Sequence, residues 1–239
     1  MIQWLRSLIF VIVIYAMMLV MGIVFLPWAL VSPKGARFAC KTYAQATLWL
    51  AHWMVGIETE VRGPVPTDEV LIASKHQSFL DIIMIYNAVP AAKFIMKREL
   101  LYTPVIGQYA YRLGCVPVSR GKRAEAIRQM VADVKAGRAN PGQLCIYPQG
   151  TRIKPGVQAP YKIGTYALYR ELGQPCVLAA TNAGLFWPRK GIGRTPGRAV
   201  VEFIEPIPLG VEQVDFMQMM ESRIEERSEA LLDEAGFQR

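Results

Sequence analysis

Histidine is scarce in this sequence and paired cysteines are missing, and each shortage narrows the possible chemistry. Two histidines occur in 239 residues. The four cysteines form no Cys-x-x-Cys pair, and three of them lie in short apolar runs, as reduced core cysteines do. There is no zinc-ligand spacing, no recognition-helix signature and no basic tail, so we expect neither a metal site nor nucleic-acid binding. There is also no Gly-x-Ser-x-Gly motif, which a serine esterase or lipase would need for its nucleophile.

Charge is missing from residues 8–31, which are almost wholly apolar. As a helix up to residue 26, this segment would extend roughly 28 Å at about 1.5 Å per residue, close to the bilayer core of roughly 30 Å. A cleaved signal peptide is the alternative, but its apolar core should be only about 7–15 residues long and be followed by a small-residue cleavage site. We therefore expect a retained N-terminal membrane anchor.

The next segment, residues 38–55, is amphipathic and rich in aromatic residues. It fits an interfacial helix, the second helix of a hairpin with the anchor, or an ordinary surface helix packed on the domain. Its histidine, His52, has no carboxylate nearby on the same helix face, and we interpret it as a packing residue. We predict that residues 1–56 form the membrane anchor and residues 57–239 a catalytic domain.

The net charge of +8 is carried outside the apolar segment, because Arg6 is the one basic residue of 27 that precedes Ser32. Such a surface suits anionic lipid headgroups, phosphorylated substrates or an acidic carrier protein. Lys34, Arg37 and Lys41 place more positive charge after the apolar segment than Arg6 places before it. This asymmetry favours an inner-membrane protein whose catalytic domain faces the cytoplasm.

Beyond residue 56, strand-like and helical patterns alternate without a repeat or a low-complexity linker. The clearest helical pattern spans residues 123–136, and a charged amphipathic helix is expected at residues 215–235. The alternation predicts an α/β fold in which helices cover both faces of a sheet. The strand-like runs are residues 58–62, 70–74, 92–96, 115–119, 144–147, 176–180 and 199–204.

His76 lies in a polar loop directly after a strand-like run, and Asp81 follows five residues later. On one continuous helix, residues at this spacing do not face each other. Ser78 and Asp81, however, form the capping-box pattern Ser-x-x-Asp ahead of an apolar run, which puts His76 in the loop and Asp81 in the first turn of a helix. The loop can then bring the two together, so that the carboxylate orients the imidazole as a general base. The alternative is that Asp81 only caps the helix and complements its dipole.

Basic residues follow three of the strand-like runs, at Lys97, Arg120 and Arg152. Ligands of open α/β sheets gather at the C-terminal ends of the strands. Arginine suits phosphate because its guanidinium binds two oxygens, and Gly150 would let the backbone approach an anion. Each basic residue alone is more often a solvated turn residue, but three at the sheet edge of the His76 loop predict an anion site.

These residues together resemble the glycerolipid acyltransferases, specifically the 1-acylglycerol-3-phosphate (lysophosphatidic acid) acyltransferases. The resemblance covers about residues 57–205, and the N-terminal anchor matches in position. Four motifs in order at suitable spacing make the resemblance specific. The four motifs are His-x4-Asp at His76 and Asp81, the strand ending in Arg120, Pro-Gln-Gly-Thr-Arg at 148–152, and the apolar strand after Pro175. Two further stretches also match, Lys-x-Glu-Leu at 97–100 and Tyr-Lys-Ile-Gly at 161–164.

The resemblance implies a mixed sheet flanked by helices and an acyl transfer from acyl-CoA or acyl-carrier protein to the sn-2 hydroxyl of lysophosphatidic acid. His76, oriented by Asp81, would take the proton of that hydroxyl, and neither a cofactor nor a metal would be needed. Phospholipid biosynthesis at an anionic membrane surface would be the setting. The acceptor phosphate would be held by Arg120, Gly150, Thr151 and Arg152, with Lys97 as a weaker candidate and Lys162 and Gln149 in support.

One residue departs from the family pattern in a way that bears on mechanism. Gln149 stands where the third motif usually has a glutamate, so any role of that carboxylate is in doubt here. Residues 186–190, Phe-Trp-Pro-Arg-Lys, fit an interfacial patch or an ordinary exposed loop. Two other functions stay open: acylation of a different lyso-lipid, such as a lysophospholipid or lyso-ornithine lipid, and a non-catalytic adaptor that binds anionic lipid.

Overall fold

A computed structural model of the 239-residue chain shows one mixed sheet with helices on both faces. It describes residues 1–118, 125, 128, 129, 131, 132 and 142–238. The predicted helix at residues 123–136 lies largely outside the described residues. The strands are β1 (Ile57–Arg62), β2 (Leu71–Ser74), β3 (Lys93–Lys97), β4 (Val116–Val118), β5 (Leu144–Ile146), β6 (Cys176–Thr181) and β7 (Gly197–Ile207).

The strand order is β1-β7-β6-β2-β5-β3-β4. Strands β6, β2, β5, β3 and β4 are parallel to their neighbours in this series, whereas β7 is antiparallel to β6 and parallel to β1. The predicted α/β fold with a mixed sheet is therefore confirmed. Because the central strands are parallel, the loops that follow β2, β5 and β3 emerge at one edge of the sheet.

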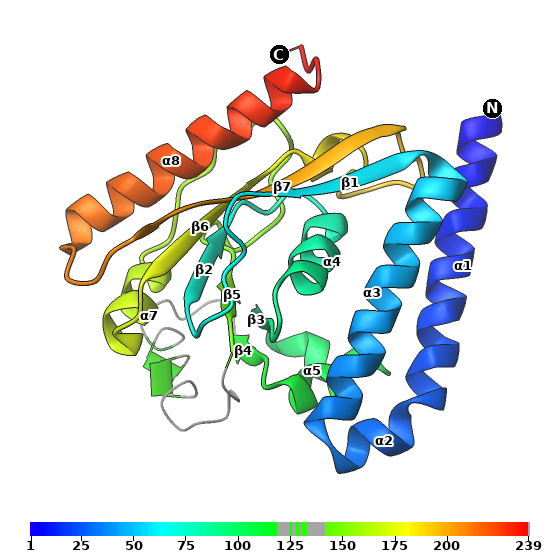
Figure 1. The fold of residues 1–239 in the computed structure, drawn as a ribbon, viewed down its shortest axis with the longest axis horizontal. Helices are drawn as coiled ribbons and strands as arrows, with labels where there is room; N and C mark the ends of the chain where they lie inside the picture. Colours follow the sequence, from blue (N-terminus) through cyan, green and yellow to red (C-terminus); the bar gives the residue numbers. More distant parts are fainter. Residues whose placement is uncertain (119–124, 126–127, 130, 133–141, 239) are drawn as a thin grey trace.

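Alternate residues of the central strands face two different helix layers. Ile72, Cys145 and Val177 belong to a core shared with the N-terminal helices and α4 (Phe79–Ala88). The residues on the second face of these strands, among them Leu71 and Leu144, pack against α7 (Gly164–Leu172) and α8 (Gln213–Glu234). Figure 1 shows α8 on one side of the sheet and α4 on the other. Both faces are covered, which is why β6 reads as a continuous apolar run.

Three helices precede the sheet: α1 (Ile2–Val24), α2 (Leu26–Val31) and α3 (Pro33–Val55). Helix α3 begins five residues before the predicted segment, because Pro33 occupies its first turn and the Ser32 hydroxyl caps it by accepting from Lys34 N (3.2 Å). Gly56, in the left-handed conformation at φ 74°, ends the helix one residue before β1. The division into an anchor at 1–56 and a catalytic domain remains a prediction.

Helix α1 runs beside α3 (Figure 1) and is long and apolar enough to cross a membrane, with a mean hydropathy of 2.8. One face of α1 packs on the rest of the protein. Phe10 meets the Trp187 ring edge-on at 5.3 Å, and the Gln3 amide donates to the carbonyls of Val55 and Arg194, both at 3.0 Å. The opposite face of α1 is exposed and apolar, and includes Leu5, Ile12, Leu19 and Ile23.

Two further elements bear on the sequence predictions. Helix α8 confirms the amphipathic helix expected at residues 215–235 to within two residues. His52 is exposed, and its ring meets the neighbouring Trp53 ring edge-on at 5.2 Å. The interpretation of His52 as a packing residue is therefore wrong, because the face of α3 that carries it points away from the core.

The packing of α1 predicts that this helix contributes to the stability of the whole fold. Phe10 is fully buried against Trp187, so Phe10→Ala should lower the free energy of unfolding by about 3–5 kcal/mol. The neighbouring Ile9 is 45% exposed, and Ile9→Ala should change it by less than about 0.5 kcal/mol. Urea unfolding in mild detergent, followed by tryptophan fluorescence, measures both. Equal effects of the two substitutions would show that α1 is not part of the folded core.

Candidate active site

The loop between β2 and α4 brings His76 and Asp81 into direct contact. His76 Nδ1 lies 2.9 Å from Asp81 Oδ1. The other carboxylate oxygen, Oδ2, accepts from the backbone N–H groups of Gln77 (2.8 Å) and Ser78 (2.7 Å). Ser78 Oγ in turn accepts from Leu80 N (3.0 Å), so the capping box is present as well. The two interpretations of Asp81 are thus compatible, since one oxygen serves the helix and the other the histidine.

The hydrogen bonds around Asp81 determine which nitrogen of His76 carries the proton. The carboxylate is fully buried and the imidazole is 12% exposed. A carboxylate accepts hydrogen bonds, so its contact with Nδ1 assigns the proton to that nitrogen in the neutral ring. Nε2 then has a free lone pair. Within the described part of the chain Nε2 meets no hydrogen-bond partner, and this arrangement suits a general base for an incoming hydroxyl.

Tyr147 fixes the plane of the imidazole, a role that the sequence analysis missed. Its ring stacks on His76 with a centroid distance of 3.9 Å and an interplanar angle of 19°. The Phe94 ring continues the stack at 6.1 Å from Tyr147. Burial, and to a lesser degree the Asp81 carboxylate, raise the pKa of Tyr147 well above its ordinary value, so the phenol stays neutral. The one feature of the sequence that could have pointed to this role is that an aromatic residue, Tyr147, directly precedes Pro148 of the third motif.

The loop after β5 carries the third motif and is bonded to the His76 loop. Ile153 N donates to the carbonyl of His76 (2.8 Å). Thr151 and Arg152 directly precede Ile153, so this hydrogen bond holds their backbone close to the His76 loop. Gly150 has a φ of 70°, and a Cβ at this position would lie 2.6 Å from Lys162 Nζ. The Lys162 ammonium therefore lies directly over the Gly150 backbone. Three of the predicted phosphate-site residues, Gly150, Thr151 and Arg152, thus lie in the loop that is bonded to the His76 backbone, with the supporting residue Lys162 over Gly150.

The other two predicted basic residues have different outcomes. Lys97 ends β3 and forms a salt bridge with Glu99 at 3.1 Å, with about half of its side chain exposed. It reaches the same sheet edge, but its ammonium already has a carboxylate partner. Arg120 lies outside the described residues, and its place in the phosphate site stays a prediction.

Trp187 supports the site from behind. Ser78 Oγ donates to the Trp187 carbonyl at 2.6 Å, and the Trp187 ring meets Phe79 edge-on at 6.0 Å. Phe186 and Trp187 are 7% and 4% exposed, so neither of the two interpretations of residues 186–190, an interfacial patch or an exposed loop, holds for the aromatic members. They turn inward because they fill the space between α1, α4 and the sheet. Arg189 is exposed and donates to the Arg152 carbonyl at 3.0 Å.

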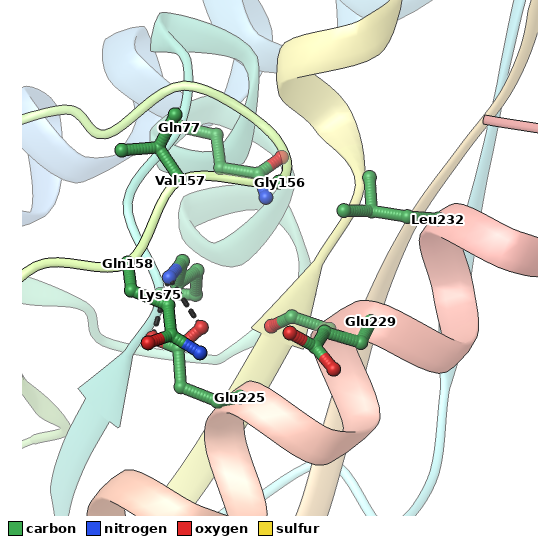
Figure 2. Close-up of a pocket in the computed structure, with 9 residues that line it drawn as sticks. Lys75, Gln77, Gly156, Val157, Gln158, Glu225, Glu229 and Leu232 are labelled. Carbon is green, nitrogen blue, oxygen red and sulfur yellow. Dashed lines mark hydrogen bonds and ion pairs between the residues drawn. The ribbon is translucent and has the colours of Figure 1, made fainter. Parts of the chain in front are cut away.

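A buried charge cluster lies on the α8 side of the same loops. Lys75, the residue before His76, forms a salt bridge with Glu225 of α8. Gln149 Nε2 donates to the Ala159 carbonyl (3.2 Å) and to Glu225 Oε1 (3.4 Å). Figure 2 shows Lys75 and Glu225 facing each other at a small pocket. Lys75 and Glu225 were not predicted from the sequence, because nothing local marks a helix residue so distant in the chain as a partner of the loop.

Comparison with known proteins agrees with the geometry. A family model described as Acyltransferase matches residues 57–180. The 1-acyl-sn-glycerol-3-phosphate acyltransferase of Pseudomonas aeruginosa is 30% identical over 200 residues, which cover 82% of this chain and 78% of that protein. The 1-acyl-sn-glycerol-3-phosphate acyltransferase alpha of Bos taurus is 29% identical over 168 residues, which cover 67% of this chain and 58% of that protein.

A solved structure shows the same fold. The crystal structure of the 1-acyl-sn-glycerophosphate (LPA) acyltransferase, PlsC, from Thermotoga maritima superposes with a TM-score of 0.78 at 19% identity, over 96% of this chain and 97% of that one. The matched region includes the His76–Asp81 pair, the Gly150–Arg152 loop and β6. The chain therefore belongs to the acyltransferase family that includes the 1-acyl-sn-glycerol-3-phosphate acyltransferases, and it is an O-acyltransferase.

Proposed function

We propose that this protein transfers an acyl group from acyl-CoA or acyl-carrier protein to the sn-2 hydroxyl of 1-acylglycerol-3-phosphate, giving phosphatidic acid. The observation that carries the proposal is the His76–Asp81 pair, which is oriented as a base with a free Nε2. Such a pair activates a hydroxyl, and the acceptor lipid supplies one. Relatives named for this reaction share the region that holds the pair.

The reaction follows from the geometry of the base. As the acceptor hydroxyl oxygen attacks the thioester carbonyl, its proton passes to His76 Nε2, and Asp81 stabilises the imidazolium that forms. The tetrahedral intermediate then collapses, the carbon–sulfur bond breaks, and the imidazolium returns the proton to the departing thiolate. The new ester carries the acyl group, and no acyl-enzyme forms. The proposal requires no metal and no bound cofactor.

The acceptor phosphate is proposed to bind at the loop after β5. Arg152 offers a charged two-point donor, and Gly150 lets the backbone and the Lys162 ammonium above it approach an anion. Thr151 adds a hydroxyl, and Lys97 ends β3 at the same edge. Arg120, outside the described residues, is proposed as a further ligand of the phosphate. The Ile153–His76 bond couples this site to the base, so a held phosphate also holds the glycerol hydroxyl near Nε2.

Membrane attachment is proposed to use the exposed face of α1. Its other face is bound to the protein by the Gln3 hydrogen bonds and by Tyr109 OH, which donates to the Gly22 carbonyl at 2.9 Å. A helix held in this way can insert its free apolar face into one leaflet while the active site stays at the headgroups. The excess positive charge of the chain supports an anionic, cytoplasm-facing leaflet of the inner membrane.

Removal of the proposed base should abolish most of the turnover. His76→Ala is expected to lower kcat by about 10²–10⁴-fold, the usual contribution of general-base catalysis. His52→Ala is the matched control, because this second histidine is exposed on α3, and it should leave kcat unchanged. Release of thiol from acyl-CoA and from acyl-carrier protein, with lysophosphatidic acid as acceptor, measures both variants. Unchanged turnover in His76→Ala would refute the mechanism.

Loss of Arg152 should act through the acceptor phosphate. Arg152→Ala is expected to raise the KM for lysophosphatidic acid by about 10- to 100-fold, since a hydrogen bond to a charged group is worth about 1.5–3 kcal/mol. Lys154→Ala, two residues on and exposed, is the control and should behave like the wild type. A panel that adds lyso-ornithine lipid and monoacylglycerol tests the acceptor. If Arg152→Ala raises the KM equally for acceptors with and without a phosphate, Arg152 does not bind the phosphate.

Charges on the free face of α1 should release the protein from membranes. Ile12 and Leu19 are 59% and 54% exposed and lie two helical turns apart. Ile12→Lys with Leu19→Lys should lower binding to anionic vesicles by more than about 10-fold, because burying each side chain is worth about 1.5–3 kcal/mol. Val214→Lys on α8, 74% exposed, adds the same kind of charge and should not lower binding. Flotation of the purified variants measures this, and unchanged binding of the α1 variant would exclude α1 as the anchor.

A further inference from the structure

Helix α8 contributes a carboxylate to the catalytic loops, although it lies outside the region matched by the family model. Both oxygens of Glu225 accept from Lys75 Nζ, at 2.5 and 2.7 Å. Oε1 also accepts from Tyr161 OH at 2.8 Å and from Gln149 Nε2 at 3.4 Å. The Glu225 cluster consists of Glu225 and the three side chains that donate to it, Lys75, Gln149 and Tyr161. The cluster joins α8 to the loop after β2 and to the loop after β5.

The opposite charges of Lys75 and Glu225 stabilise each other inside the protein. The Lys75 side chain is 3% exposed and that of Glu225 is 18% exposed. A buried ammonium without a carboxylate partner is strongly unfavourable, so Glu225 determines where the Lys75 side chain can rest. Burial and the Glu225 carboxylate raise the pKa of Tyr161 well above its ordinary value, which keeps its hydroxyl a donor to Glu225.

The backbone carries this constraint directly to the catalytic base. Lys75 N donates to the Ala179 carbonyl of β6 at 2.9 Å, and His76 is the next residue. Lys75 is thus held at its backbone by the sheet and at its ammonium by α8. On the other loop, Gln149 is held by Glu225 one residue before Gly150. The same carboxylate therefore sets the position of the base and of the proposed phosphate loop relative to each other.

The cluster also explains why position 149 holds glutamine. The Gln149 amide nitrogen faces two acceptors, the Ala159 carbonyl and Glu225 Oε1. A glutamate there would direct its carboxylate at a carbonyl oxygen and at a second carboxylate. An amide donor fits where a carboxylate would be repelled. Glu225 already supplies a negative charge beside position 149, where the third motif usually has a glutamate.

We propose that Glu225 is a positioning residue of the active site and takes the structural place of the carboxylate that the third motif usually carries. Its role is to fix Lys75, and through it His76, and to fix Gln149 and the Gly150–Arg152 loop that follows. The inference rests on the proposed function, because acyl transfer is its readout.

The first experiment removes only the charge. Glu225→Gln should lower kcat by about 10- to 100-fold, since a displacement of the base on the order of 1 Å can cost about 100-fold in rate. Glu226→Gln is the matched control, because Glu226 is the next residue of α8 and is exposed. It should leave kcat and KM unchanged. Equal kcat values for Glu225→Gln and the wild type would overturn the proposal.

The second experiment moves the charge instead of removing it. Gln149→Glu alone should also lower kcat, because two carboxylates then face one Lys75 ammonium. Lys75 Nζ and Gln149 Nε2 both contact Glu225 Oε1, so a carboxylate at position 149 is within reach of Lys75 once Glu225 is neutral. The double variant Gln149→Glu with Glu225→Gln should therefore have a higher kcat than either single variant. A general loss of packing would not produce this recovery.

The outcomes separate this inference from the proposed function. All variants are assayed on whichever lyso-lipid of the panel the wild type acylates fastest, and their thermal unfolding midpoints are measured alongside. Absence of wild-type activity on lysophosphatidic acid overturns the assigned acceptor, while the ratios among variants on the preferred acceptor still test Glu225. Losses in kcat that add up in the double variant, with no recovery, overturn the role of Glu225.

Discussion

The Asp81 carboxylate is the constraint on which the active site depends. It accepts two backbone N–H groups and the Nδ1 proton of His76 within one short loop. Because it is fully buried, its negative charge is held in a place where only donors can surround it. The start of α4, the orientation of the imidazole and the unprotonated Nε2 of the neutral ring all follow from this one group. Tyr147 then fixes the ring plane by stacking on the imidazole itself.

The loops around this dyad are held from both faces of the sheet. On one face, Trp187 accepts from Ser78 through its carbonyl and packs against Phe10 of α1, so the apolar N-terminal helix reaches the back of the catalytic loop. On the other face, Glu225 of α8 holds Lys75. The proposed acceptor is a membrane lipid, which would require the base to be held at a fixed height above the bilayer. The contact between Phe10 of α1 and Trp187 connects the apolar helix to the loop that carries His76.

The strands were largely predictable, and so was the contact between His76 and Asp81. All seven strand-like runs correspond to β1–β7 within a few residues, because central parallel strands are buried on both faces and read as apolar runs. Pro117 did not prevent β4, since β4 is an edge strand and needs fewer ladder hydrogen bonds. The start of α3 and the orientation of Trp187 were mispredicted. The start of α3 is set locally by Ser32 and Pro33, which precede the amphipathic pattern, whereas the orientation of Trp187 depends on packing with segments that are distant in the chain.

The sequence by itself determined the His76–Asp81 pair, because the capping box and the dyad share a few consecutive residues and local hydrogen bonds are enough to build them. It also determined that Gly150 and Arg152 follow a strand, while the pairing of that strand with β2 came from the structure. Only the tertiary structure decided what Gln149 and Lys75 do, because their partner Glu225 lies 150 residues beyond Lys75 on α8. Electrostatic complementarity in a buried cluster is a property of positions in space, which no local pattern encodes.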